Sequence, residues 1–188
     1  MVEVDEQIIE HITSLRKSAI IGISGLGGAG KSTVAEILSN QTGIPVVGVD
    51  SFIKNRTDTS YTNWEIVDFA RLEKEVLQPF LQGENPVRYG HLDWDGNRIN
   101  ETKEILHNGY LVIEGVGLFR PELLKYFVYK IWVDCPIGEG IARGKKRDRE
   151  VYHNPQDESW DGVWKKNDEE YVKNFHPKES ADVVINNY

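Results

Sequence analysis

A glycine-rich stretch near the N-terminus constrains this sequence more than any other feature. Residues 25–32 read Gly-Leu-Gly-Gly-Ala-Gly-Lys-Ser and match the pattern GxxxxGK(S/T). An apolar run at 19–24 comes directly before the stretch, and Val34, Ile37 and Leu38 follow it at helical spacing. A buried strand, a glycine loop and a helix in this order are the setting in which the pattern forms a phosphate-binding loop. We therefore expect the chain to bind nucleotide phosphates.

The residues of this loop have separate chemical roles. Several backbone N–H groups must point at one anion, which requires backbone conformations that residues with a Cβ resist. Lys31 would face solvent in the empty loop and reach the β and γ phosphates, and the Ser32 hydroxyl would ligate Mg²⁺. The expected nucleotide-binding residues are Gly25, Gly27, Gly28, Ala29, Gly30, Lys31, Ser32 and Thr33.

The composition favours one cytosolic domain that does not bind nucleic acid. With 188 residues, the chain is long enough for one sizeable core and short for two, so residues 1–188 are expected to form a single domain. A net charge of −8 argues against a duplex-binding surface. Cys135 is the only cysteine, which excludes a disulfide framework and a cysteine metal site. The first ten residues are too acidic for a signal peptide, and no apolar run is long enough to span a membrane.

The rest of the chain alternates predicted strands and helices. Strands are expected at 19–24, 46–49, 110–113, 129–133 and 183–185, and helices at 4–17, 69–81, 121–127, 137–149 and 164–175, besides the helix that follows the loop. This order predicts an α/β fold of the P-loop NTPase type, with a parallel sheet, helices on both faces and ligands at the carboxyl ends of the strands. Two excursions, at 52–68 and 86–99, interrupt the alternation, and a turn signal makes the second a predicted hairpin.

Two carboxylates stand where predicted strands end. Asp50 follows the strand at 46–49, and Glu114 follows the strand at 110–113. A carboxylate in this position can hold Mg²⁺ or accept a proton from an attacking hydroxyl. A lone acidic residue at a strand end is more often a helix cap or a solvated charge. The pair, together with the loop upstream, favours the functional interpretation.

A basic segment at 143–149 holds five cations in a chain that is acidic elsewhere. Arginines held over a γ-phosphate stabilise the charge that develops during phosphoryl transfer, and a lid that carries them excludes water. Arg143 and Arg147 are the candidates, on a predicted lid at about 143–162. The alternative is a solvated basic helix face, which applies more to the lysines than to these two arginines.

Aromatic and polar residues gather in the two excursions. They are Tyr61, Trp64, Tyr89 and Trp94, with Asp68, His91 and Asp93. Such a set could form an acceptor pocket whose rings stack on a base, or the rings could simply pack on the edge of the sheet. The sequence leaves both interpretations open.

At these motifs the chain resembles the uridine kinase and phosphoribulokinase family of phosphate-loop kinases, from about residue 19 to 186. The loop is similar to the family's GxSGxxxSGKT pattern, and residues 50–52 resemble its Asp-(Ser/Asp)-Phe-Tyr element. Residues 112–115 look like its Glu-Gly strand end, and 142–148 resemble the Arg-Arg-x-x-Arg-Asp lid. Residues 177–185 look like its closing strand, Pro-x-Lys-x-x-Ala-Asp-x-Ile-Ile.

The chain departs from the family pattern at several positions. Ile53 replaces a tyrosine, Glu65 stands for an aspartate, and Gly144 replaces one lid arginine. The segment from Val151 to Trp164 is also similar to nicotinamide riboside kinases, so a second acceptor stays open.

The resemblance implies an ATP-dependent kinase that phosphorylates a hydroxyl of a small ribosyl acceptor, with the 5′-hydroxyl of uridine or cytidine favoured. Asp50 would accept the hydroxyl proton, and Ser32 and Glu114 would organise Mg²⁺, although the two carboxylates could exchange roles. Lys31, Arg143 and Arg147 would neutralise phosphate charge. The acceptor contacts would come from Asp50, Asp68 and Arg143, with Tyr89 or Trp94 stacking on the base.

Two other functions stay open at this point, and a third is disfavoured. One is a nicotinamide riboside kinase or another small-alcohol kinase of the same fold. Another is a nucleotide sensor without catalysis, which the departures from the family pattern allow. A GTP-dependent switch is disfavoured because the sequence has no Asn-Lys-x-Asp for guanine. A homo-oligomer is compatible with the sequence.

Overall fold

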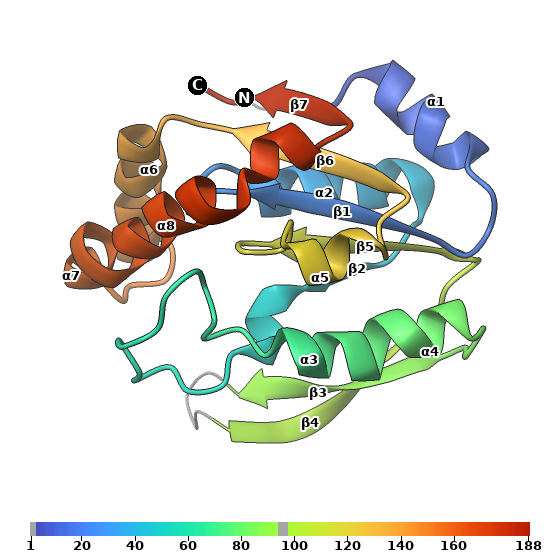
Figure 1. Cartoon of the computed structure of the whole chain (residues 1–188), viewed down its shortest axis with the longest axis horizontal. Helices are drawn as coiled ribbons and strands as arrows, with labels where there is room; N and C mark the ends of the chain where they lie inside the picture. Colours follow the sequence, from blue (N-terminus) through green and yellow to red (C-terminus); the bar gives the residue numbers. More distant parts are fainter. Residues whose placement is uncertain (1–2, 94–97) are drawn as a thin grey trace.

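The structure is a computed structural model that describes residues 3–93 and 98–188, and a five-stranded parallel sheet forms its centre (Figure 1). The strands are β1 (Ala19–Gly25), β2 (Val46–Gly48), β5 (Tyr110–Gly115), β6 (Tyr129–Asp134) and β7 (Val183–Asn186). Their order across the sheet is β2-β5-β1-β6-β7, and every pairing is parallel. The predicted α/β fold is therefore confirmed, with each strand close to its expected place.

Helices cover both faces of this sheet, as predicted. The longer ones are α1 (Glu6–Ser14), α2 (Lys31–Thr42), α6 (Ile137–Glu150) and α8 (Lys165–Phe175), and the shorter ones are α3 (Phe69–Leu72), α4 (Gln78–Leu81), α5 (Pro121–Leu124) and α7 (Asp157–Ser159). The predicted helix at 69–81 forms as α3, the π-helical turn η2 (Glu73–Leu77) and α4 in succession. Tight 3₁₀ turns form at η1 (Val49–Phe52) and η4 (Pro177–Ser180), and η3 (Trp160–Trp164) is a second π-helical turn.

Alternating strand residues divide the core between the two faces, because successive side chains of a strand point in opposite directions. Ile21 and Ile23 of β1 pack with α1 and α2, while Ile20 joins the cluster that contains Leu123 of α5 and Tyr171 of α8. Both faces of β1 are buried, which explains its continuous apolar run. No helix among the described residues is long and apolar enough to cross a membrane.

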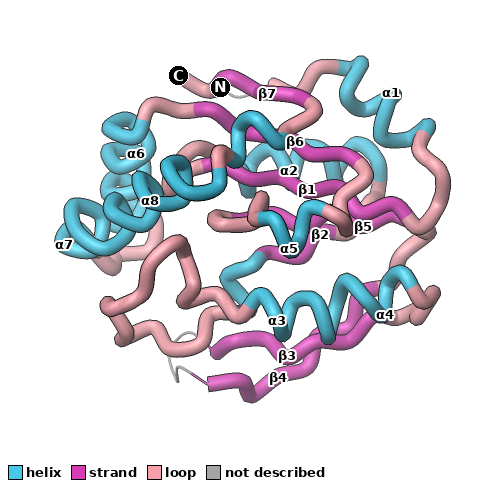
Figure 2. Tube along the Cα trace, viewed as in Figure 1, coloured by secondary structure: helices cyan, strands magenta, loops and turns pink. Residues whose placement is uncertain are grey.

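A separate hairpin lies beside α3 and α4 (Figures 1 and 2). It pairs β3 (Val87–Asp93) with β4 (Arg98–Ile105) and is longer than the predicted excursion at 86–99. The extra length follows from Ile105, which lies opposite Val87 and packs against the core. The hairpin is thereby fixed to the body of the protein at its base.

The parallel register brings three functional segments to one edge of the sheet. Ser24, which comes before the loop, lies opposite Gly115, and Gly48 lies opposite Glu114. The loop, Glu114 and the segment that begins at Asp50 therefore meet at the carboxyl ends of β1, β5 and β2. This is where ligands bind in sheets of this type.

Candidate active site

The glycine loop has the backbone conformation that its sequence predicts. Gly28 and Gly30 have φ values of 69° and 97°, which residues with a Cβ rarely adopt. At Gly28 a Cβ would also lie 2.0 Å from the carbonyl oxygen of Gly140 in α6. Helix α2 begins at Lys31, and Gly30 before it has no side chain to cap the first turn. The amides of that turn therefore stay available to an anion.

Lys31 is buried, and the expectation that it faces solvent is wrong. Its side chain is folded back onto the loop, the residue is 8% exposed, and Nζ donates to the Leu26 carbonyl oxygen at 2.7 Å. Burial lowers the pKa of Lys31, and the carboxylates of Glu114, Asp168 and Asp50 oppose that shift. The cation is therefore held inside the site by three negative groups.

The charge of Lys31 acts on the carboxyl groups of both Glu114 and Asp50. Burial, with the nearby Asp50 carboxylate, raises the pKa of Glu114 to about 7, against the opposing effects of Lys31 and the Ser32 hydroxyl. Asp50 is exposed at the mouth of the site, yet the atoms around it exclude enough water to raise its pKa. The charges of Lys31 and Arg147 oppose that shift. Burial thus makes both carboxyl groups weaker acids than solvated ones, which marks them as candidates for proton transfer or metal binding.

The residues proposed for Mg²⁺ fit that ion. The Ser32 hydroxyl donates to the two carboxylate oxygens of Glu114 at 3.3 and 3.4 Å, so two hard oxygen donors already meet. Residues 3–93 and 98–188 contain no group of three or more His, Cys, Asp or Glu side chains that could hold a metal by themselves. This agrees with Mg²⁺, which protein sites commonly hold through one or two carboxylates, with water and phosphate supplying the remaining ligands.

The two lid arginines have different surroundings. Arg147 donates to the Asp148 carboxylate, from Nε at 3.1 Å and Nη2 at 2.9 Å, and its charge lowers the pKa of both Lys31 and Asp50. Arg143 donates instead to the carbonyl oxygen of Asn187 at 2.8 Å, beyond the end of β7. Arg147 is therefore the arginine that acts on the charge cluster, and the catalytic role of Arg143 stays a prediction.

Trp160 occupies the space beside Gly144, the position at which the family pattern has an arginine. A Cβ at Gly144 would lie 2.1 Å from the Trp160 ring, and Trp160 is 4% exposed. The indole Nε1 donates at 2.7 Å to Asp148, whose other carboxylate oxygen accepts the bonds from Arg147. The predicted lid at 143–162 thus comprises the end of α6, a turn, α7 and most of η3. Its Trp160 ring packs on the glycine loop at Gly27.

A pocket of about 320 Å³ lies between the segment after Asp50, the start of α3 and the hairpin. Its lining residues are Ile53, Lys54, Asp68, Arg71, Leu92, Arg98 and Ile99. Asp68 also caps α3 by accepting from the Arg71 backbone N–H at 3.0 Å. Six of these seven residues lie in the two predicted excursions, and of the predicted acceptor contacts among the described residues the pocket includes Asp68.

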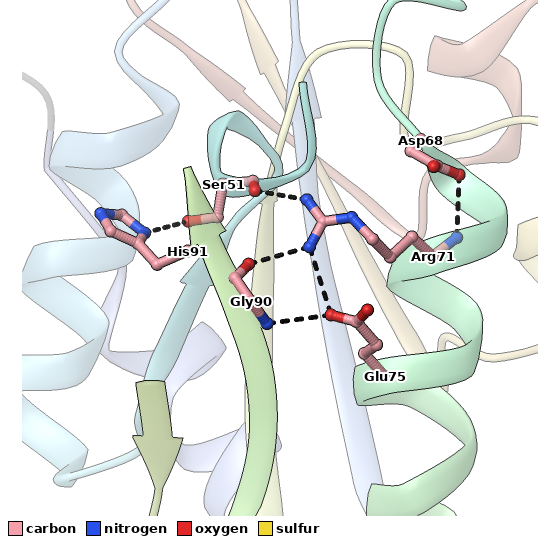
Figure 3. A network of polar contacts seen from close by, with 6 residues as sticks. All are labelled: Ser51, Asp68, Arg71, Glu75, Gly90 and His91. Carbon is pink, nitrogen blue, oxygen red and sulfur yellow. Dashed lines mark hydrogen bonds and ion pairs between the residues drawn. The ribbon is translucent and has the colours of Figure 1, made fainter. Parts of the chain in front are cut away.

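Arg71, which the sequence interpretation missed, ties the walls of this pocket together (Figure 3). Its guanidinium donates to the carbonyl oxygens of Ser51 at 2.6 Å and Gly90 at 2.8 Å, and it pairs with Glu75 at 3.2 Å. The Ser51 hydroxyl in turn contacts Nδ1 of His91 at 3.0 Å. The segment beside Asp50 is therefore fixed to the hairpin. The sequence offers one signal for Arg71, which is a basic residue between the apolar residues Phe69 and Leu72 of a predicted helix.

The aromatic residues of the excursions do not act as one group. Tyr89 is 5% exposed and stacks on Phe52 with ring centroids 5.5 Å apart, which contradicts its predicted stacking on a base. Trp64 is also buried and packs in the core. Trp94 lies outside the described residues. The packing interpretation is thus correct for Tyr89 and Trp64, because both rings complete the core beneath the excursions.

A second missed residue, Asp168 of α8, lies against the glycine loop. Its carboxylate accepts from the Gly27 backbone N–H at 2.8 Å and from the Trp64 indole at 2.9 Å. Burial raises the pKa of this carboxyl to about 6, although both hydrogen bonds and the charge of Lys31 oppose the shift. In the sequence Asp168 is one acidic residue in a charged helix, so nothing there distinguishes it.

Comparison with known proteins identifies the family. A family model described as an AAA domain matches residues 21–173. The chain belongs to the AAA domain family. A uridine kinase of Lactobacillus helveticus is 26% identical over 148 residues, which cover 71% of this chain and 69% of that protein. One from Clostridium perfringens is 27% identical, with coverage of 71% and 70%.

Other relatives of this AAA domain agree on the fold and on kinase chemistry. A 2-phosphoglycerate kinase of Methanopyrus kandleri is 27% identical over 154 residues, which cover 70% of this chain and 46% of that protein. A structure described as a possible uridine kinase from Bacillus stearothermophilus superposes with a TM-score of 0.71, 20% identity and 96% coverage of both chains. The resemblance to uridine kinase-like P-loop kinases is confirmed, and the protein is a phosphotransferase.

The raised pKa of Glu114 predicts how the stability of this AAA domain depends on pH. A carboxyl whose pKa is higher in the folded state than in the unfolded state costs stability when it ionises. The free energy of unfolding should therefore fall as pH rises from about 4.5 to about 7, the interval between the two Glu114 pKa values. Glu114→Gln should reduce this fall by on the order of 1–3 kcal/mol.

Denaturant titrations at pH 5 and pH 8, without nucleotide or Mg²⁺, would measure the effect. The control is Glu36→Gln, an exposed carboxyl on α2, which should leave the decline unchanged. An equal decline in Glu114→Gln and the wild type would contradict the assigned environment of Glu114.

The packing of Trp160 predicts opposite effects for two glycines of the same helix. Gly144→Ala should lower the free energy of unfolding by about 1–3 kcal/mol, because the new methyl group overlaps the indole ring. Gly138→Ala meets open space and should be neutral or stabilising by up to about 1 kcal/mol. Chemical denaturation of both variants gives the comparison, and equal stabilities would show that Trp160 does not pack against α6.

Proposed function

We propose that this protein transfers the γ-phosphoryl group of Mg²⁺-ATP to a hydroxyl of a small ribosyl acceptor, with the 5′-hydroxyl of uridine or cytidine favoured. The observation that carries the proposal is the buried Lys31 at the loop, on which the charges of Asp50 and Glu114 act, with a pocket that begins at Ile53, three residues after Asp50. The curated relatives named uridine kinase support the same acceptor class.

Asp50 is the proposed general base. It is exposed at the mouth of the site and is followed by Ser51, which Arg71 holds in place. Its raised pKa makes the carboxylate a stronger proton acceptor than a solvated aspartate. The acceptor hydroxyl loses its proton to Asp50 as its oxygen attacks the γ-phosphorus, and the bond from the γ-phosphorus to the β,γ-bridging oxygen breaks and releases ADP.

Lys31 and Arg147 are the proposed charge-stabilising groups. Nζ of Lys31 leaves the Leu26 carbonyl oxygen for the β and γ phosphates, because a phosphate anion is a stronger acceptor than a carbonyl group. Arg147, oriented by the buried Asp148, adds donors for the charge that develops on the transferred group. Mg²⁺, which Ser32 and Glu114 would hold, neutralises phosphate charge when it is bound.

Asp68 is the proposed contact for a ribose hydroxyl, since it lines the pocket with Arg71. The predicted contacts of Arg143 and Trp94 with the acceptor stay proposals. A hydroxyl-reading site leaves buried polar groups unpaired when the hydroxyl is missing, so the pocket should reject deoxy analogues.

A second candidate acceptor is an alcohol that carries an anionic group. The pocket has three cations, Lys54, Arg71 and Arg98, against the one carboxylate of Asp68, although Glu75 pairs with Arg71. The relative named 2-phosphoglycerate kinase supports this alternative.

The base assignment predicts a specific kinetic change. Asp50→Asn keeps the shape of the side chain and cannot accept a proton, so turnover should fall roughly a hundredfold or more. The affinity for ATP should change little. Steady-state kinetics with a nucleotide-binding titration separates the two quantities, and Asp5→Asn, far along the chain in an N-cap, is the control. A loss of ATP affinity with unchanged turnover would move Asp50 to the metal site.

A screen of hydroxyl compounds with Mg²⁺-ATP tests the acceptor. We expect ADP release to depend on uridine or cytidine more than on nicotinamide riboside, with the 2′- and 3′-deoxy analogues at least roughly a hundredfold weaker. Release that depends only on a phosphorylated or carboxylated alcohol would select the second candidate. ATP binding without release for any acceptor would support a sensor instead of a kinase.

A further inference from the structure

One buried carboxylate joins two segments that serve different ligands. Asp168 of α8 is 2% exposed, and each of its oxygens accepts one N–H group. Oδ2 accepts from Gly27 in the nucleotide loop at 2.8 Å, and Oδ1 accepts from Trp64 in the excursion at 52–68 at 2.9 Å. The excursion forms one side of the acceptor pocket through Ile53 and Asp68.

The neighbouring residue strengthens the link on the excursion side. Asn167 is fully buried, and its side chain accepts from the Trp64 backbone N–H at 2.8 Å and donates to the Tyr61 carbonyl oxygen at 3.2 Å. Trp64 has a φ of 60°, a left-handed conformation that a bulky residue adopts only where its surroundings hold it. Helix α8 therefore determines the conformation of this part of the excursion, which Figure 2 shows as a long loop facing α8.

The loop side of the link is equally constrained. A Cβ at Gly27 would lie 2.9 Å from the Trp160 ring and 3.2 Å from Oδ2 of Asp168. Gly27 is thus held at its N–H by the carboxylate and at its α-carbon by the indole. Lys31 contributes as well, since its charge favours the ionised form of Asp168.

A carboxylate is a costly choice for a purely structural position. Burying the charge carries a desolvation cost that a neutral side chain would avoid. In return, a carboxylate accepts hydrogen bonds at both oxygens, whereas an amide has only one oxygen for this purpose. The two donors here belong to the nucleotide loop and the acceptor excursion.

We propose that Asp168 is a positioning residue that couples nucleotide binding on the loop to the ordering of the acceptor excursion at 52–68. A nucleotide that orders Gly27 also orders the shared carboxylate, so less entropy is lost when Trp64 is fixed. By linkage, an ordered excursion strengthens nucleotide binding by the same factor. This proposal rests on the proposed function only where it names the excursion as the acceptor side.

Amide hydrogen exchange tests this coupling with a non-hydrolysable ATP analogue and Mg²⁺ as the only ligands. In the wild type, saturation with the analogue should slow exchange of the amides at 61–68 by about fivefold or more. In Asp168→Asn the slowing should fall below about twofold, because one of the two N–H groups loses its acceptor. Protection of residues 25–32 in the same spectra verifies that the nucleotide is bound.

Glu169→Gln is the matched control. It makes the same chemical change one residue away, on an exposed side chain paired with Lys165, and should keep the wild-type response. Trp64→Phe removes the indole donor and leaves the Gly27 bond, so it should lose the response, and by linkage its nucleotide affinity should fall by no more than about the same fivefold factor. If Asp168→Asn does not fold, Trp64→Phe by itself tests the coupling between nucleotide binding and the excursion.

Two results would overturn the proposal. One is a wild-type excursion whose exchange does not respond to the nucleotide. The other is a full response in Asp168→Asn or in Trp64→Phe. Because no acceptor is present, failure of every compound in the acceptor screen would contradict the proposed function and leave this measurement intact.

Discussion

The buried ammonium group of Lys31 is the interaction on which the rest of the site depends. Three carboxylates act on it, from Asp50 after β2, Glu114 at the end of β5 and Asp168 on α8. Desolvation raises the pKa of each of these acids, and the charge of Lys31 opposes that rise. The parallel sheet supplies the geometry, because its register ends three strands at one edge. The sheet therefore brings Asp50 and Glu114 near Lys31, and the charge of Lys31 stabilises the ionised forms of all three acids.

Helices α6 and α8 complete the site through two pairs of aspartate and tryptophan. Asp148 accepts from Trp160, and Asp168 accepts from Trp64, and both acids are almost fully buried. Each acid also bonds to a functional group, Arg147 in the first case and the Gly27 N–H in the second. The two pairs thus connect the lid and the acceptor excursion to the same glycine loop, which the Trp160 ring covers.

Two departures from the family pattern, Gly144 and Ile53, have different structural consequences. At Gly144 the absence of a side chain leaves room for the Trp160 ring. Trp160 donates to Asp148, and Asp148 in turn accepts from Arg147. Ile53 lines the pocket between the excursion at 52–68 and the hairpin, so an apolar side chain stands there in place of the tyrosine of the family pattern. The two departures thus lie in different parts of the structure, Gly144 in α6 under the Trp160 ring and Ile53 at the wall of the pocket.

The sequence by itself determined the fold class, the glycine loop and the places of Asp50 and Glu114. These features depend on local spacing, since apolar runs, glycines and strand ends are visible within a few residues. Tertiary structure alone decided the burial of Lys31, the core position of Tyr89 and the contacts of Arg71 and Asp168. The contacts that decide them join residues far apart in the chain, such as Arg71 and Ser51, 20 positions apart, and Gly27 and Asp168, 141 positions apart. No local pattern encodes such contacts, because they form only when the sheet brings distant segments to one edge.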